Sequence, residues 1–164
     1  MLSMKTTLPL FLVILTSLGL ACSASGVTLR ADGSPGPQEC SERALETMKF
    51  FQLYPGEAAF MEIDVKQVAQ SPITLTDGPI ESYTTEELGA LPSKTRLYGR
   101  VWTTGPNVII RYYEARPPGG ELISICGIAG NDRRSGLRKR PDSPPGGALL
   151  TDSDSAIWIV DSFR

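Results

Sequence analysis

Few side chains in this sequence have the types and spacings needed for chemistry. The 164-residue chain contains no histidine, which excludes Ser-His-Asp and Cys-His mechanisms as well as imidazole metal sites. No glycine-rich phosphate or dinucleotide pattern is present. Close carboxylates occur at three places: Glu62 and Asp64, Glu86 and Glu87, and Asp152 and Asp154. Paired acids can hydrolyse a glycosidic bond, but charged residues are mostly solvated, so we predict no catalytic residue, metal site or cofactor.

The N-terminus has the composition of a secretion signal. Lys5 precedes a short apolar run that ends in small residues, an order that predicts a signal peptide over residues 1–21. The stretch Leu18–Cys22 resembles a bacterial lipobox, in which the cysteine is lipidated, although Gly19 stands where that motif prefers leucine. We therefore predict a lipid anchor at Cys22. Ordinary signal-peptidase cleavage after Ala24 is the alternative.

Three cysteines are an awkward number for a chain exported to an oxidising compartment. Lipidation of Cys22, or its removal by cleavage, leaves Cys40 and Cys126 as an even pair. We expect this pair to form a disulfide that closes a long loop, which adds about 4 kcal/mol to stability in the chain-entropy picture.

Aromatic and arginine side chains alternate along the strand predicted over 95–103, and the following strand continues the pattern across a hairpin. Six residues are expected to form one candidate binding face: Arg96, Tyr98, Arg100, Trp102, Arg111 and Tyr113. Interleaved rings and guanidinium groups can stack on planar or sugar-like ligands and pair with anions. The alternative is that these long side chains cover one another or enter the core.

A basic segment over 133–140 is the second candidate surface. Five basic residues lie in it, within a chain of net charge −2: Arg133, Arg134, Arg138, Lys139 and Arg140. Such a segment could dock on lipid headgroups or on an anionic envelope polymer, and a solvated, mobile loop is the alternative. Because the whole chain is slightly acidic, we expect no nucleic-acid partner.

Hydrophobic periodicity predicts one helix followed by strands. Apolar residues recur at three- and four-residue steps over Glu39–Leu53, residues 59–65 alternate like a half-buried strand, and a short helical turn is expected over 85–91. Further strands are expected over 95–103, 107–115, 121–130 and 156–160. This order predicts an α+β fold, with an N-terminal helix packed on a mainly antiparallel β-sheet that could curl into a barrel.

The chain is expected to have three parts. Residues 1–21 are the signal peptide, and residues 22–37, rich in Ser, Gly, Ala and Pro, read as a flexible tether. Residues 38–164 are long enough for a single globular domain.

Two segments near the C-terminus carry a family resemblance. The run RKRPDSPPG over Arg138–Gly146 and the ending AIWIVDSFR are similar to small predicted lipoproteins of myxobacteria. The resemblance implies an envelope lipoprotein and assigns no function to any residue.

Together these features predict a non-enzymatic lipoprotein of the bacterial cell envelope, held at the outer membrane or the periplasmic face by Cys22. Its expected partners are the membrane, through the lipid, and an anionic envelope polymer or a protein. The alternatives are a secreted hydrolase that uses acids such as Glu62 and Asp64, and a structural subunit of an envelope complex.

Overall fold

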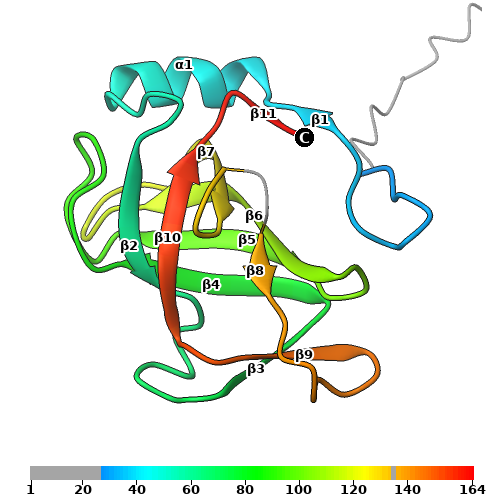
Figure 1. The fold of residues 1–164 in the computed structure, drawn as a ribbon. Coiled ribbons are helices and arrows are strands. Elements are labelled where there is room, and N and C mark those ends of the chain that lie inside the picture. The colour runs from blue at the N-terminus through cyan, green and yellow to red at the C-terminus, as the bar shows by residue number, and fades with distance from the viewer. Residues whose placement is uncertain (1–26, 134–135) are drawn as a thin grey trace, which may run out of the picture.

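The computed structural model describes residues 27–133 and 136–164, so the predicted signal peptide, Cys22 and Arg134 lie outside the described residues. Figure 1 shows the elements in chain order. They are β1 (Gln38–Glu39), α1 (Glu42–Phe50), β2 (Ala58–Glu62), β3 (Ile73–Thr76), β4 (Gly78–Thr84), β5 (Arg96–Trp102), β6 (Asn107–Arg116), β7 (Ile123–Ala129), β8 (Leu137–Arg138), β9 (Gly147–Leu150), β10 (Asp154–Ile159) and β11 (Ser162–Phe163).

Six strands form a closed antiparallel barrel. Their order is β5-β4-β2-β10-β7-β6, and β6 pairs again with β5 to close the ring. Closure leaves these strands without a free sheet edge. The short pairs β1–β11 and β3–β9 lie outside the barrel, and Figure 1 shows α1 at one end of the barrel and the β3–β9 pair at the other.

The predicted α+β class is wrong, because the fold is mainly β. Among the described residues, strands hold 44% and the one helix holds 7%. An open sheet would need the helix as a second layer to cover its apolar face. Here the pairing of β5 with β6 turns that face inward, so the strands bury it among themselves and α1 is an addition to a complete barrel. The sequence allowed that the sheet could curl into a barrel, and the structure has this barrel.

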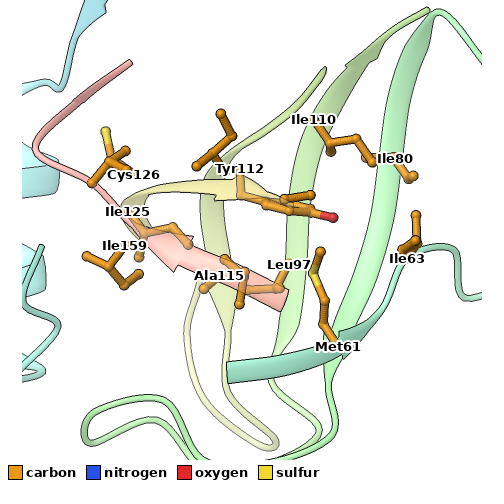
Figure 2. Close-up of a cluster of buried hydrophobic side chains, with 14 of the residues drawn as sticks. Met61, Ile63, Ile80, Leu97, Ile110, Tyr112, Ala115, Ile125, Cys126 and Ile159 are labelled. Carbon is orange, nitrogen blue, oxygen red and sulfur yellow. The ribbon is translucent and has the colours of Figure 1, made fainter. Parts of the chain in front are cut away.

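The inside of the barrel is filled by side chains. Figure 2 shows the ring of Tyr112 lying among Met61, Leu97 and Ile110, all of which are fully buried. The Tyr112 hydroxyl lies 2.7 Å from the hydroxyl of Ser82, which in turn donates to the carbonyl of Ile63. Burial strongly raises the pKa of Tyr112, so the phenol stays protonated and its polar end is satisfied inside the barrel.

A β-bulge in β6 decides which side chains enter the barrel. Tyr98 pairs with Glu114 and Gly99 pairs with Tyr112, so Tyr113 is an extra residue without a partner on β5. Successive inward-facing residues of β6 are therefore three positions apart at the bulge, at Tyr112 and Ala115, instead of two. At Gly99, a Cβ atom would lie 2.3 Å from the carbonyl oxygen of Arg111, so only glycine fits this close approach.

The helix is shorter than predicted at both ends. Ser41 caps its N-terminus by accepting a hydrogen bond from the Ala44 amide at 3.1 Å, so the helix starts after Cys40. It ends where Gln52 takes a left-handed conformation with φ of 56°. The expected helical turn over 85–91 is a bridged turn between Leu88 and Leu91. In the described part of the chain no helix has the length and apolar character to cross a bilayer.

The predicted disulfide is confirmed. Cys40 and Cys126 are bonded, with Cα atoms 6.1 Å apart. The bond ties the residue before the helix cap to β7, against which α1 packs through its buried residues Ala44 and Met48. The amide of Cys126 points at the Met48 sulfur, 3.2 Å away.

Residues 28–36 of the segment expected to be a tether form a folded loop, of which residues 34–36 are buried against the barrel. Leu29 bridges to Pro35, and the Gly36 amide donates to the carbonyl of Thr28 at 2.6 Å. Asp32 closes the turn by accepting from the amide and hydroxyl of Ser34, bonds that lower the pKa of this carboxyl. The folded body therefore begins before residue 38. We call residues 28–36 the N-terminal strap.

Candidate functional site

The structure divides the six-residue aromatic–arginine face into a covered part and an open part. Trp102 and Arg111 are only 5% and 1% exposed. Arg111 lies on the outer side of β6, covered by the N-terminal strap and β11, and the Trp102 ring lies beside its guanidinium group. Neither side chain can meet a ligand while these segments stay in place.

Arg111 is buried between aromatic rings and the strap. Its guanidinium carbon lies 4.7 Å from the Phe163 ring and 5.8 Å from the Trp102 ring. Its Nη2 donates to the carbonyl of Gly36 at 2.8 Å. Burial lowers the pKa of this guanidinium, and Tyr113 acts in the opposite direction. Since no carboxylate pairs with Arg111 among the described residues, its charge is held by ring faces and backbone carbonyls.

We expect Arg111→Ala to lower the free energy of unfolding by about 1.5–3 kcal/mol, the usual effect of losing hydrogen bonds made by a charged group. The strap should also loosen, because its carbonyls lose their donor. Denaturant unfolding measures the first effect, and faster amide hydrogen exchange over residues 28–36 measures the second. The matched control is Arg116→Ala, an exposed arginine 5.8 Å from the Tyr98 ring, and an equal loss in both variants would contradict this role.

The open part of the face is engaged in local contacts. Arg96 forms an ion pair with Glu81 at 3.0 Å, and Arg100 lies over the Trp102 ring at 5.6 Å. Tyr113 donates to the side chain of Gln38 at 3.1 Å and meets the Phe163 ring edge-on. Most of this face therefore packs against neighbouring groups of the same chain.

The basic segment is divided in a similar way. Lys139 donates to the carbonyls of Thr103 and Gly105. Arg140 binds both carboxylate oxygens of Asp142, each at 2.9 Å, and these bonds lower the pKa of Asp142. Arg133 and Arg138 are exposed. Two of the predicted cations therefore hold the loop in shape, and Arg138 presents its charge from β8.

Two adjoining cavities lie along β10, and they bring the basic segment next to acidic residues. The basic cavity, of about 380 Å³, is lined by Arg138, Lys139 and Arg140. The acid–aromatic cavity, of about 490 Å³, is lined by Glu86 and the rings of Phe60 and Trp158. Four residues line both cavities: Asn131, Asp152, Asp154 and Ser155. We call the two together the β10 cleft.

Sequence reasoning missed the aromatic half of this cleft. Phe60 is 59% exposed and lies on the outer face of β2, a position visible in the sequence as a ring among charged residues. Trp158 donates its indole N–H to the carbonyl of Gly130 at 2.8 Å, which fixes the ring. No sequence pattern joins these two residues, because β2 and β10 are far apart along the chain.

Glu62 and Asp64, the acids named for a hydrolase, lie in different surroundings. β2 ends at Glu62, and the Asp64 carboxylate accepts from the Lys66 amide at 2.9 Å and the Gln67 side chain at 2.7 Å. Asp64 thus closes a turn, whereas Glu62 lies opposite Asp154 on the outer face of the barrel. Residues 27–133 and 136–164 contain no group of three acidic or cysteine side chains placed to hold a metal ion.

A larger, apolar cleft of about 750 Å³ lies between α1 and the connection from β6 to β7. Phe50, at the end of the helix, is 80% exposed, and Leu122 on the opposite wall is 38% exposed. Exposed apolar side chains grouped in this way are typical of contact surfaces.

The comparisons with known proteins give no relative to place beside this geometry. No protein-family model matches the chain, and no curated protein matches it.

Proposed function

We propose that this protein is an envelope lipoprotein that binds a partner without catalysis. The lipobox-like stretch and Cys22 supply the anchor, and the disulfide-linked barrel presents the β10 cleft. The chain's resemblance to small myxobacterial lipoproteins agrees with this placement. The expected partner is a protein or an anionic polymer of the envelope, because the cleft offers charges of both signs.

One observation carries this proposal. The barrel interior is filled by Tyr112 and its neighbours, so a ligand must bind on the outside. The β10 cleft is lined by cations, carboxylates and two aromatic rings. Cavities that combine apolar walls with a few convergent polar groups are the usual form of a binding site.

Intact mass measurement on protein extracted from bacterial membranes tests the anchor. We expect a mature chain that starts at Cys22 and carries added acyl mass, because more than one acyl chain is needed for stable anchoring. Cys22→Ser should lose the added mass and leave the membrane fraction. A soluble wild-type chain that starts at Ser25 would overturn the anchor.

Photo-cross-linking in cells tests the cleft. A photoreactive residue in place of the exposed Arg138 should give cross-links to envelope material, since this position lines the basic cavity. The matched control is the exposed Lys66, which lines neither cavity. Cross-links of equal yield at both positions would contradict binding in the cleft.

The apolar cleft favours a second function, that of a subunit in an envelope complex. Its exposed Phe50 and Leu122 would then be covered by another protein. Phe50→Asp would release the protein from such a complex in a native gel of membrane extracts, whereas a substitution of Arg138 would leave the complex intact.

A further inference from the structure

The outer faces of β2 and β10 leave a hollow between two aromatic rings. The register places Ala58 opposite Trp158 and Phe60 opposite Ala156, so each ring faces a methyl group across the strands. Rings in diagonal positions can reach each other, yet these two described side chains make no ring–ring contact. The hollow belongs to the acid–aromatic cavity.

Carboxylates surround this hollow. Asp154 lies opposite Glu62 in the next row of the strand register, and Glu86 and Asp152 line the same cavity. No lysine or arginine of the described chain lines it. Asp152 and Asp154 form no ion pair among the described residues, although both also line the neighbouring basic cavity.

We infer that the acid–aromatic cavity binds an organic cation, namely the guanidinium or ammonium side chain of a basic polypeptide; this rests on the proposed binding function and names its ligand. Aromatic faces attract cations through the ring quadrupole, and the carboxylates add charge-assisted hydrogen bonds. A volume of about 490 Å³ has room for one such side chain together with its backbone.

Titration of the full-length protein in detergent, followed by NMR of its backbone amides, tests this inference. The probes are N-acetyl-arginine amide and the neutral N-acetyl-glutamine amide. We expect the arginine probe to shift the amides of Phe60, Asp154 and Trp158 and the glutamine probe to leave them unchanged. Added salt should weaken the binding, since both carboxylates and probe are partly exposed to solvent.

Two variants and their controls separate the contributions. Phe60→Ala and Asp154→Asn should each weaken binding of the arginine probe about two- to fivefold, as expected for one exposed cation–π contact or one exposed ion pair. Both residues are exposed, so the variants should fold. The controls Phe50→Ala and Glu87→Gln likewise remove a phenyl ring and a carboxylate charge, but outside the cavity, and should leave the affinity unchanged.

Three results would overturn the inference: equal binding of the neutral probe, shifts confined to another surface, or an equal loss of affinity in the controls. The proposed function is tested independently of this inference. If the mature chain carries no lipid and position 138 gives no cross-links while the arginine probe still binds at Phe60, the cation site stands without the envelope role. If anchoring and cross-linking hold and the probe does not bind, the ligand class alone is wrong.

Discussion

Replacing Cys40 and Cys126 together by serine is expected to lower the free energy of unfolding by about 4 kcal/mol. The two cysteines are 86 residues apart in sequence, and a crosslink that closes so long a loop removes much of the conformational freedom of the unfolded chain. The bond also fixes the start of α1 to β7, so the variant should lose order in the helix first. Denaturant unfolding of the oxidised protein and the double variant measures the difference.

Cys22→Ser is the matched control for this experiment, because it makes the same chemical change outside the described body. Its free energy of unfolding should equal that of the wild type within about 0.5 kcal/mol. A double variant as stable as the wild type would show that the disulfide contributes nothing beyond what barrel closure already supplies.

Truncating Tyr112 to alanine should cost about 3–5 kcal/mol, the range found for large aromatic side chains removed from a packed core. Tyr112 is completely buried, and Figure 2 shows its ring in the middle of the barrel, in reach of strands on several sides. Tyr112→Phe should cost only about 1 kcal/mol, because it keeps the ring and loses the hydrogen bond to Ser82.

The neighbouring Tyr113 provides the contrast. It is the extra residue of the bulge and lies half-buried on the outer face, so Tyr113→Ala should cost less than Tyr112→Ala in the same denaturation experiment. If both substitutions cost the same, the bulge does not direct the two side chains to opposite faces as the structure describes.

Much of the local structure followed from the residues alone. Alternation over residues 59–65 predicted a half-buried strand, and in β2 Met61 is buried and Phe60 is exposed. The β5–β6 hairpin and the Cys40–Cys126 bond were likewise predicted. These features depend on periodicity, turn residues and cysteine counting, which act over short distances or need only a residue type.

The fold class was not predictable in the same way. Whether a meander of strands stays open or closes depends on the pairing of β10 with β2 and with β7, strands that are far apart along the chain, and no local pattern encodes these contacts. The bulge at Tyr113 was likewise not predictable from a local pattern. It shifts the inward and outward positions of β6, so the singled-out Tyr113 lies outside while Tyr112 fills the core.

By itself, the sequence determined the cysteine pairing, the positions of the barrel strands other than β4, and the presence of a basic segment. The tertiary structure alone decided which charged side chains are free to contact a ligand. It buried Arg111 under the N-terminal strap, used Lys139 and Arg140 to hold a loop, and placed Phe60 beside Trp158 to make a cavity. Such a site has no sequence signature, because its members lie on strands that only barrel closure brings together.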